Sequence, residues 1–429
     1  MSASERAIAP LGHPVDAEVR LPGSKSLTNR ALVCAALAAE QSTLDGALRA
    51  DDTEAMIGCL AALGVVIDTD WDAARVTVGG AGGRFPVGDA TLDARMSGTT
   101  ARFVAPLLAL GHGRRRLTGH PQLLARPMGP TVAALRSLGA QITAAGEDGR
   151  LPIVIDARGG LRGGSVELPG HVSSQFLSGL LLAAPAMDEG FTATITSPLV
   201  SRPYLALTTA TMAAFGVEVD ARDDPPAFTV AAGHYRARDL RIEPDASAAS
   251  YFFAAAAVCG GRVRVPGLGS ASGQGDLAFA HVLGRMGAEV EQTESWTEVR
   301  GTGRLEGIEV DLADLSDTAP TLAVVAACAS TPTTVTGVGF IRAKESDRIG
   351  AAVTELRRCG VDAEEQPDGF VVRPDPSGLH GARVATYDDH RMAMSFAVLG
   401  LRVAGITITD PACVAKTFPD FFEVLEGLR

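Results

Sequence analysis

Cationic side chains recur in this sequence just before, or just inside, stretches that predict helices. They are Lys25, Arg30, Arg102, Arg126, Lys344, Arg348, Arg391 and Lys416. The free N–H groups and the dipole of a helix N-terminus favour anions, and Lys and Arg add charge-assisted hydrogen bonds to carboxylates and phosphates. Because the whole chain has a formal net charge of −12, this local group of cations predicts a site for a strongly anionic small substrate rather than for nucleic acid.

The first of these cations, Lys25, lies in the segment Leu-Pro-Gly-Ser-Lys-Ser-Leu-Thr-Asn-Arg at residues 21–30. Ser24 and Ser26 offer hydroxyl groups beside the ammonium group, and Arg30 follows about one helical turn after Ser26. Such a set is typical of a cradle for a phosphate or a carboxylate. It is not a Walker A loop, because Ser24 rather than Gly precedes Lys25. Taken alone, the segment is a weak signal, because Gly-Ser before a helix is more often an ordinary cap.

Acidic side chains accompany the cations in the second half of the chain. Asp317 is predicted to cap a fifth helix and Asp389 a sixth, and Glu345 lies in Lys-Glu-Ser-Asp-Arg at residues 344–348. Each has a simple explanation as a helix cap or a solvated charge. The basic run Arg114–Arg116 is expected to be a solvated loop.

Six predicted helix starts position these residues, and they recur at a nearly constant interval. Each time, small or polar capping residues precede an almost wholly apolar segment, which predicts a buried helix. The successive intervals are 72, 75, 72, 72 and 72 residues, between starts at Ser26, Gly98, Ser173, Asp245, Asp317 and Asp389. A fixed period of this length indicates an internal repeat, which determines the architecture before any single element does.

A second series of segments supports the same period. Amphipathic stretches end in an apolar-Gly-apolar signature, which predicts a helix that stops at a left-handed Gly and continues as a strand. The glycines are Gly64, Gly139, Gly216, Gly287 and Gly360, and a sixth copy closes at Gly427. We therefore predict six units of about 72 residues, each with a buried helix, an amphipathic helix and several short strands.

The composition is typical of a globular protein with more than one domain. The 429 residues are 46% hydrophobic and 21% charged, which provides ample core. The apolar segments, at about 13 residues, are too short to span a bilayer, and the first residues contain no apolar signal region. The six cysteines show no CxxC pairing, so buried reduced thiols are expected. These features predict a cytoplasmic protein whose six units divide into two domains, with a crossover near residues 238–243.

Nine motifs, in order along the chain, resemble those of the 3-phosphoshikimate 1-carboxyvinyltransferase family, the EPSP synthases. They are LPGSKSLTNRA, SGTTARF, the ARP turn, VSSQF, SRPY, DASAASYF, AKESDR, YDDHRMAM and AKTFPDFF. The resemblance implies two inside-out α/β domains, each of three βαβαββ repeats with buried helices, and an active site in the interdomain cleft. The N-terminal domain would be residues 22–240, on the shikimate-3-phosphate side. The C-terminal domain would be residues 1–21 together with 241–429.

In that family, the 5-hydroxyl of shikimate-3-phosphate receives the enolpyruvyl group of phosphoenolpyruvate by addition and elimination, and phosphate is released. The resemblance implies that Asp317 is the base on the hydroxyl, that Glu345 protonates the methylene carbon, and that Lys25 shares in this proton transfer. It assigns to shikimate-3-phosphate the residues Lys25, Ser26, Arg30, Ser173, Ser174, Gln175, Ser201, Tyr204, Asp317 and Lys344. It assigns to phosphoenolpyruvate the residues Lys25, Gly98, Arg126, Gln175, Arg348, His390, Arg391 and Lys416. The fourth helix start, at Asp245, receives no ligand and is expected to serve the crossover.

Two positions depart from the family pattern. Met96-Ser97-Gly98-Thr99 stands where members commonly carry Asn-Ala-Gly-Thr, so a side-chain amide contact is lost or replaced by Ser97. Phe340 stands where many members have an Asn that touches the shikimate ring. The charged residues of the pattern are all present.

The resemblance also implies a monomeric enzyme of the shikimate pathway and aromatic amino-acid biosynthesis, which is a target of glyphosate. No cofactor is implied, and neither nucleic acid nor a membrane is expected as a partner. No metal is expected, because the eight histidines form no ligand pair with metal-binding spacing.

Two other functions remain open on the same scaffold. The sister transferase that acts on UDP-N-acetylglucosamine shares the fold and phosphoenolpyruvate. Its members carry Lys-Asn at the first motif and a reactive Cys in the first domain, whereas this chain has Lys25-Ser26 and no Cys between Cys59 and Cys259. A non-catalytic anion-binding protein is the other possibility, although binding alone would not require an acid and a base.

Overall fold

The computed structural model describes residues 5–429, so residues 1–4 of the predicted C-terminal domain lie outside the described residues. Contacts divide the chain into an N-terminal unit, Gly23–Glu243, and a C-terminal unit, Pro244–Arg429 together with Met1–Pro22. In the N-terminal unit, the backbone N of Ser24 donates to O of Glu243 at 2.8 Å. In the C-terminal unit, N of Asp245 donates to O of Pro22 at 2.9 Å. The chain therefore leaves and re-enters each unit at neighbouring points.

The N-terminal unit contains three four-stranded sheets with one common topology. The first strand pairs in parallel with the second, the second pairs antiparallel with the fourth, and the fourth pairs antiparallel with the third. The sheet orders are β14-β3-β5-β4, β6-β7-β9-β8 and β10-β11-β13-β12. The strands are β3 (Gln41–Asp45), β4 (Val66–Asp70), β5 (Arg75–Gly79), β6 (Ala90–Asp93), β7 (His112–Thr118), β8 (Gln141–Ala144), β9 (Ile153–Arg158), β10 (Gly164–Leu168), β11 (Phe191–Ile195), β12 (Asp220–Asp223), β13 (Pro226–Val230) and β14 (Leu240–Arg241). The helices between them are α1 (Lys25–Leu37), α2 (Asp51–Ala62), α3 (Gly98–Leu107), α4 (Pro121–Leu124), α5 (Gly129–Ser137), α6 (Ser174–Ala183) and α7 (Arg202–Ala214).

The C-terminal unit repeats this topology twice and then varies it. Its sheet orders are β16-β17-β15-β2, β18-β19-β21-β20 and β1-β23-β22. In the last sheet, β1 pairs antiparallel with β23 and takes the place of the hairpin. The strands are β1 (Glu5–Ala7), β2 (Val15–Glu18), β15 (Gly261–Pro266), β16 (Glu289–Gln292), β17 (Trp296–Gly301), β18 (Glu309–Asp311), β19 (Thr333–Thr336), β20 (Asp362–Gln366), β21 (Gly369–Arg373), β22 (Arg383–Val384) and β23 (Thr407–Thr409). The α-helices are α8 (Ala246–Cys259), α9 (Phe279–Arg285), α10 (Ala319–Ala327), α11 (Arg348–Arg358), α12 (His390–Gly400) and α13 (Phe421–Glu426).

Two sheets receive their first strand from a distant part of the sequence. β14 returns from residues 240–241 to pair in parallel with β3 of the first repeat. β2 comes from residues 15–18 and pairs in parallel with β15 of the fourth repeat. The first strand of each unit is thus supplied by a segment next to a passage between the units, so both passages are anchored in sheets.

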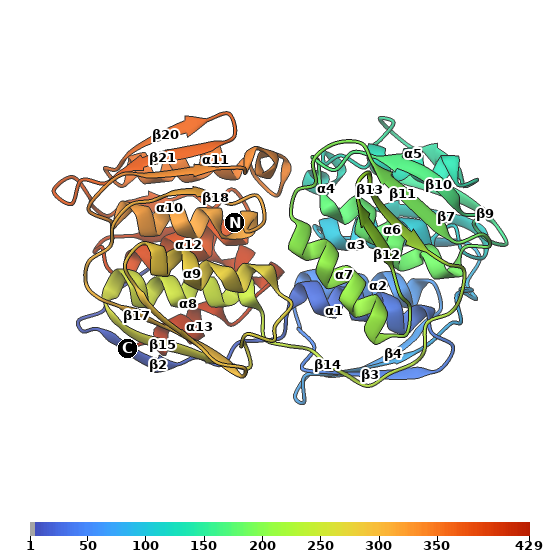
Figure 1. Cartoon of the computed structure of the whole chain (residues 1–429), viewed down its shortest axis with the longest axis horizontal. Helices are drawn as coiled ribbons and strands as arrows, with labels where there is room; N and C mark the ends of the chain where they lie inside the picture. The colour runs from blue at the N-terminus through green and yellow to red at the C-terminus, as the bar shows by residue number, and fades with distance from the viewer. Residues whose placement is uncertain (1–4) are drawn as a thin grey trace. The chain divides into compact units, whose positions relative to one another are not determined.

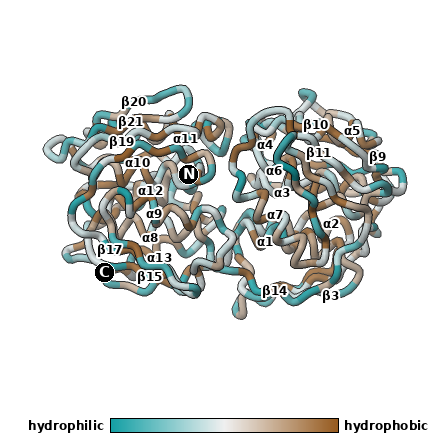
Figure 2. Tube along the Cα trace, in the orientation of Figure 1, coloured by the Kyte–Doolittle hydropathy of each residue, from teal (hydrophilic) through white to brown (hydrophobic). Residues whose placement is uncertain are grey.

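Three helices form the interior of each unit, as their all-round apolarity predicts. α1, α3 and α6 contact one another in the N-terminal unit, and α8, α10 and α12 do so in the C-terminal unit. Figure 1 shows α8, α10 and α12 inside their unit, with β15 and β17 on one outer side and β20 and β21 on another. Figure 2 shows apolar residues along these inner helices. The buried apolar residues form one cluster in each unit, so the predicted inside-out α/β architecture is confirmed.

The sequence located the ends of the repeated helices well. The six inner helices begin at Lys25, Gly98, Ser174, Ala246, Ala319 and His390, all within two residues of the predicted starts. The five repeated glycines that end the amphipathic helices have φ between +83° and +109°, a region in which Gly carries no Cβ penalty. Gly427 differs, because its φ is −65°.

One prediction about the basic residues is wrong. Arg114–Arg116 is not a solvated loop but part of β7, where alternate side chains face inward. Arg115 is fully buried, and burial lowers the pKa of its guanidinium. It donates to backbone carbonyls of Phe85, Val87, Gly88, Leu108 and Leu110. Arg115 is therefore a structural cross-link between loops.

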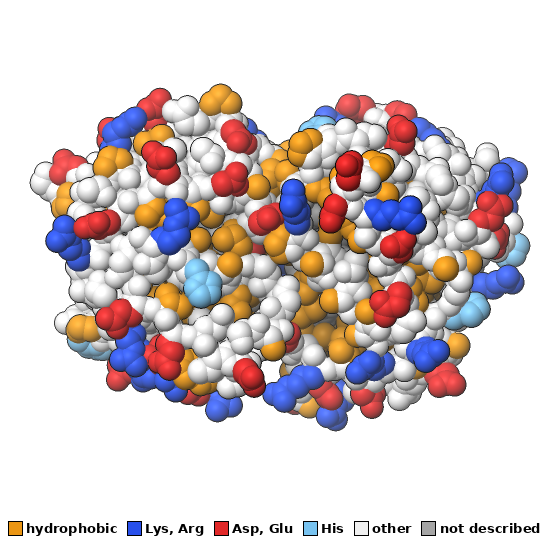
Figure 3. Space-filling view, in the orientation of Figure 1, with side chains coloured by type: hydrophobic (Ala, Val, Ile, Leu, Met, Phe, Trp, Pro, Cys, Tyr) orange, Lys and Arg blue, Asp and Glu red, His pale blue; other side chains and the backbone are white. Residues whose placement is uncertain are grey.

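Among residues 5–429, no helix is both long enough and apolar enough to cross a bilayer. On the face of the molecule in Figure 3, acidic and basic side chains are interspersed over each unit. The negative net charge is therefore not gathered into a single patch on this face.

Candidate active site

The N-terminus of α12 holds a cluster of charged residues in the C-terminal unit. Asp389 caps the helix, because its Oδ1 accepts from the backbone N of Arg391 at 3.0 Å. The same carboxylate accepts from Ser346 Oγ at 3.0 Å and from Arg348 Nε at 2.8 Å. His390 follows Asp389 directly, and its Nδ1 lies 3.6 Å from Asp389 Oδ1. One buried carboxylate therefore orders two helix N-termini, those of α11 and α12.

Arg348 is the centre of this cluster. Its side chain is 2% exposed, and it donates to Asp317 at 3.0 Å, to Glu345 at 2.7 Å and to Asp389 at 2.8 Å. Burial alone would lower the pKa of the guanidinium, but the charges of Asp389, Glu345 and Asp317 outweigh burial and raise it. Arg348 consequently remains charged.

Arg391 joins the cluster from the first turn of α12. Its Nη2 donates to Asp317 Oδ2 at 2.5 Å, and its Nη1 lies 3.3 Å from the hydroxyl of Tyr251. Tyr251 belongs to α8, and burial raises the pKa of its phenol to about 12. The fourth repeat, to which no site residue was assigned, thus contributes a side chain to this cluster.

Lys416 and Lys344 complete the cationic side of the cluster. Lys416 Nζ lies 3.8 Å from Glu345 Oε1, and only 6% of the lysine side chain is exposed. Lys344 Nζ lies 5.9 Å from the ring centroid of Phe340. Phe340, one of the two departures from the family pattern, therefore contacts a predicted site residue by a cation–π interaction.

The role predicted for Asp317 as a helix cap is wrong. Asp317 lies in a 3₁₀ turn, Ser316–Thr318, that precedes α10, and the N-cap position belongs to Thr318. Its carboxylate instead accepts hydrogen bonds from the guanidiniums of Arg348 and Arg391. A residue that points into a cationic cluster is better placed for chemistry than one that satisfies a helix end.

In the N-terminal unit, the start of α1 carries the predicted cradle. Ser24 is the N-cap and accepts from N of Leu27 at 3.4 Å. Lys25 Nζ lies 3.4 Å from Asp52 Oδ2, and the Asp52 side chain is 4% exposed. Asp52 is the second residue of α2 and was not predicted as a site residue, because in the sequence it is only the second residue of an Asp-Asp pair.

Arg30 is more deeply enclosed than its predicted role requires. It donates to Thr208 Oγ1 at 2.8 Å, to O of Ser26 at 2.9 Å and to O of Tyr204 at 3.0 Å. Burial lowers the pKa of its guanidinium to about 10. These contacts tie α1 to α7, where Tyr204 lies in the first turn and the N-cap Ser201 has a left-handed φ of 54°.

The starts of α3 and α6 lie close together in the same unit. Gln175 Nε2 donates to Thr99 Oγ1 at 3.1 Å, and Ser173 caps α6 by accepting from N of Gln175 at 3.2 Å. Ser174, the first residue of α6, is buried. Within this unit, the structure therefore brings the predicted serine and glutamine donors next to the SGTT segment.

Gly98 lies against two guanidiniums. A Cβ at this position would stand 2.4 Å from Arg102 Nη1 and 2.8 Å from Arg126 Nη1. Arg102 also donates to O of Gly98 at 3.1 Å. A side chain at this position would therefore displace Arg126, so Gly is what allows the guanidinium to lie this close to the N-terminus of α3.

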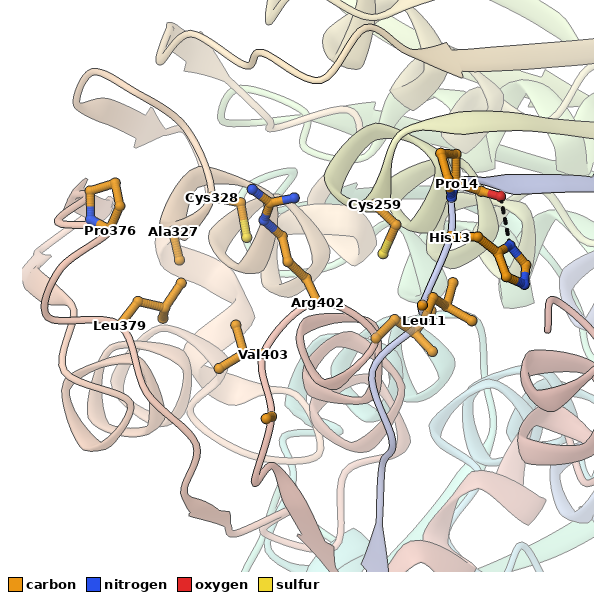
Figure 4. Close-up of a pocket in the computed structure, with 13 residues that line it drawn as sticks. Leu11, His13, Pro14, Cys259, Ala327, Cys328, Pro376, Leu379, Arg402 and Val403 are labelled. Carbon is orange, nitrogen blue, oxygen red and sulfur yellow. Dashed lines mark hydrogen bonds between the residues drawn. The ribbon is translucent and has the colours of Figure 1, made fainter.

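A cavity of about 600 Å³ in the C-terminal unit lies at the opposite ends of the inner helices (Figure 4). It is lined by Cys259 at the end of α8, by Cys328 after α10 and by Arg402 beyond α12. Arg402 donates to O of Val258 at 2.8 Å and so caps the C-terminus of α8. Burial raises the pKa of Cys259 to about 11 and of Cys328 to about 12, so neither is a nucleophile at neutral pH. Nothing in this cavity points to chemistry.

Metal ligation receives no support in the part of the chain that the structure describes, where no group of three or more His, Cys, Asp or Glu residues could hold an ion. Carboxylates of the protein offset most of the positive charge in the C-terminal cluster. Its carboxylates are Asp317, Glu345 and Asp389, and its cations are Lys344, Arg348, Arg391 and Lys416. A surplus of positive charge beside acid–base groups suits an anionic substrate that undergoes proton transfer.

Comparisons with known proteins place the chain among close relatives. The sequence matches the family model described as EPSP synthase (3-phosphoshikimate 1-carboxyvinyltransferase) over residues 11–425. The 3-phosphoshikimate 1-carboxyvinyltransferase of Trichormus variabilis is 47% identical over 416 residues, which cover 97% of each chain. That of Methanoculleus marisnigri is 45% identical and covers 96% of this chain and 97% of its own. The solved structure of EPSP synthase from Acinetobacter baumannii has a TM-score of 0.81 at 28% identity, and the match covers 99% of this chain and 98% of the other.

Proposed function

This chain belongs to the EPSP synthase family, and we propose which of its residues carry out each step of the family's reaction. The chain is an enolpyruvyl transferase of the shikimate pathway: it transfers the enolpyruvyl group of phosphoenolpyruvate to the 5-hydroxyl of shikimate-3-phosphate and releases phosphate. The alternative acceptor, UDP-N-acetylglucosamine, is not favoured by the relatives. The observation that carries the assignment is the buried cluster in which Arg348 and Arg391 share Asp317.

Phosphoenolpyruvate is bound by cations of both units. In the C-terminal unit these cations are Arg348, Arg391 and Lys416, whose positive charges are paired with carboxylates of the protein when no substrate is bound. His390 precedes Arg391 in the first turn of α12. Arg126 and Gly98 form a second anion site at the start of α3, and Lys25 and Gln175 contribute to both substrates. When the carboxylate and phosphate of the substrate bind these guanidiniums, they compete with Asp317 and Glu345 for the same hydrogen bonds.

Competition from the substrate for these guanidiniums weakens the ion pairs of Asp317 and Glu345, so that both carboxyl groups can take part in proton transfer. Asp317, relieved of part of its pairing, accepts the proton of the 5-hydroxyl as the oxygen attacks C2 of phosphoenolpyruvate. Glu345, in its protonated form, delivers a proton to C3, and Lys25 shares in proton transfer. In the second step, C3 returns a proton, the bond from C2 to the phosphate oxygen breaks, and the enolpyruvyl ether remains. Two carboxyl groups with different partners can hold different protonation states in one site.

Shikimate-3-phosphate is bound chiefly by the N-terminal unit. Ser173, Ser174 and Ser201 lie at the starts of α6 and α7, where N–H groups and hydroxyls favour a phosphate. Ser26 and Lys25 open α1, and Asp317 and Lys344 face the shikimate hydroxyls. Arg30 and Tyr204 support this surface through their mutual hydrogen bond.

The remaining proposals concern the molecule as a whole. We expect it to act as a monomer without a cofactor, and to bind neither nucleic acid nor membranes, in line with its net charge of −12. Glyphosate is expected to compete for the phosphoenolpyruvate residues, as the family implies.

The test is release of inorganic phosphate from phosphoenolpyruvate, measured with each acceptor in turn. Release is expected with shikimate-3-phosphate, with an equal amount of enolpyruvyl ether formed, and not without an acceptor. Release with UDP-N-acetylglucosamine alone would contradict the assignment. The double variant Arg348→Met and Arg391→Met should abolish release, while Arg300→Met, which changes a half-exposed arginine of β17, should not. An unchanged rate in the double variant would refute the role of the cluster.

A further inference from the structure

The turn that leads into α12 has an unusual backbone. Tyr387 and Asp388 are consecutive, and both have φ of +56°, a left-handed conformation that residues with a side chain rarely adopt. The turn is closed by a backbone hydrogen bond from N of Asp389 to O of Thr386 at 2.9 Å. Because strained conformations persist only where surrounding contacts hold them, the contacts of this turn need an explanation.

α11 holds the turn at both ends. Arg348 and Glu355 are seven residues apart on this helix, which is about two turns and places them on one face. Arg348 donates to Asp389 at the end of the turn. Glu355 accepts from N of Ala385 at 3.1 Å, at its beginning, and from the hydroxyl of Tyr387 at 2.7 Å, in its middle.

Burial of the Glu355 carboxylate at this position has a high free-energy cost. Its side chain is 0% exposed, and a buried carboxylate is retained only where polar groups surround it. Two of its partners belong to the turn, and the third, Arg358, lies 3.3 Å away one helical turn further along α11. Tyr387 as a whole is 41% exposed, so the tyrosine is not present to fill the core. What it contributes is its hydroxyl. Burial and Glu355 raise the pKa of that hydroxyl to about 12, so it donates throughout the working pH range.

We propose that Tyr387 and Glu355 are positioning residues that fix the start of α12 and thereby aim Arg391 and His390 at phosphoenolpyruvate. The inference rests on the proposed function, which gives those two residues to this substrate. A movement of the turn would displace Arg391 directly, because the backbone N of Arg391 donates a hydrogen bond to the carboxylate of Asp389. Asp389 is the residue that ends the turn. We assign neither Tyr387 nor Glu355 a direct contact with substrate.

The experiment compares Tyr387→Phe, Glu355→Gln and the double variant in steady-state kinetics with each substrate varied. Tyr387→Phe removes one hydroxyl. It is expected to raise KM for phosphoenolpyruvate about 5- to 10-fold, which is part of the roughly 12- to 150-fold that one hydrogen bond to a charged group is worth. KM for shikimate-3-phosphate is expected to change less than about 2-fold. Because both substitutions act on one hydrogen bond, the double variant should be no worse than the more affected single variant.

Tyr235→Phe is the matched control. Its hydroxyl also donates a single hydrogen bond, to O of Leu182 at 3.0 Å, but in the core of the N-terminal unit. It should cost comparable thermal stability and leave both KM values unchanged. If Tyr387→Phe behaved in the same way, with a lower Tm and an unchanged KM for phosphoenolpyruvate, the positioning role would be overturned.

A further arm separates this inference from the function on which it rests. Arg391→Lys keeps the charge but loses the forked geometry, and it should raise KM for phosphoenolpyruvate more than Tyr387→Phe does. If Arg391→Lys left that KM unchanged, the assignment of Arg391 would fail, and the positioning role would fail with it. If Arg391→Lys raised KM and Tyr387→Phe did not, only the positioning role would be refuted.

Discussion

Asp317→Asn tests the proposed base most directly, because the structure separates its chemical role from its structural one. The carboxylate accepts from Arg348 at 3.0 Å and from Arg391 at 2.5 Å. Asparagine retains one oxygen, so one of these two charge-assisted hydrogen bonds is lost, which costs about 1.5–3 kcal/mol of folding stability. For a unit of roughly 200 residues, this corresponds to a decrease in Tm of about 3–12 °C. Loss of a general base lowers kcat by about 10²- to 10⁴-fold, so the effect on turnover should far exceed any effect on substrate affinity.

Asp389→Asn is the matched control for this variant. Asp389 also binds Arg348, at 2.8 Å, and caps α12, but we assign it no contact with substrate. Asparagine can still cap a helix, so kcat should remain within about 10-fold of that of the unmodified enzyme, whereas KM for phosphoenolpyruvate should rise. The assay is phosphate release at saturating concentrations of both substrates, with Tm measured on the same samples. If Asp317→Asn kept kcat within about 10-fold, or if Asp389→Asn lowered kcat equally, Asp317 would not be the base.

Three further predictions concern other parts of the chain. Gly98→Ala places a Cβ 2.8 Å from Arg126 Nη1, so the guanidinium must move. KM for phosphoenolpyruvate should rise about 10-fold while Tm stays nearly constant. An unchanged KM would show that Arg126 does not bind this substrate. Arg115→Met removes the shared donor of five backbone carbonyls, so urea unfolding should show a loss of about 3–5 kcal/mol, whereas a loss below about 1 kcal/mol would show that water replaces the guanidinium. Burial raises the pKa of all six thiols, that of Cys259 least, to about 11. At pH 8 only about 0.1% of Cys259 is thiolate, and this fraction grows about tenfold per pH unit; a thiol reagent should therefore react slowly with the native protein and faster as pH rises, and a rapidly reacting thiol at pH 8 would contradict the burial.

The repeat was readable from the sequence because each copy carries two strong local signals. A polar cap before a wholly apolar run and a Gly that ends an amphipathic helix are both determined within a few residues. The pairings of β14 with β3 and of β2 with β15 join segments about 200 or more residues apart. No local pattern encodes such pairings. The prediction for Arg115 is wrong for a related reason. Three consecutive arginines predict a solvent-exposed segment, but the alternation of side chains along a strand buries the middle one where backbone carbonyls accept its hydrogen bonds.

The site was predictable in its charged residues and unpredictable in their partners. A Lys or Arg at a helix start is visible in the sequence, because anion binding follows from the position alone. That Tyr251 would reach Arg391 and that Asp52 would lie beside Lys25 depends on which helix faces which. Tyr251 had the appearance of an ordinary core aromatic in an apolar helix, and only its hydroxyl distinguishes it from the phenylalanines that follow it.

The repeat also explains how the cluster arose from equivalent positions. Asp245, Asp317 and Asp389 are spaced 72 residues apart and begin the three inner helices of one unit. Asp245 does only what such a residue ordinarily does, accepting from N of Ala248 at 2.9 Å as an N-cap. Asp389 caps its helix and also binds Arg348. At Asp317 a 3₁₀ turn precedes the helix, the N-cap position shifts to Thr318, and the Asp317 carboxylate pairs with the two arginines instead of capping. Because the three inner helices lie side by side, a small change in backbone at one start converts a structural carboxylate into one available for chemistry, while the other two copies continue to hold the frame around it.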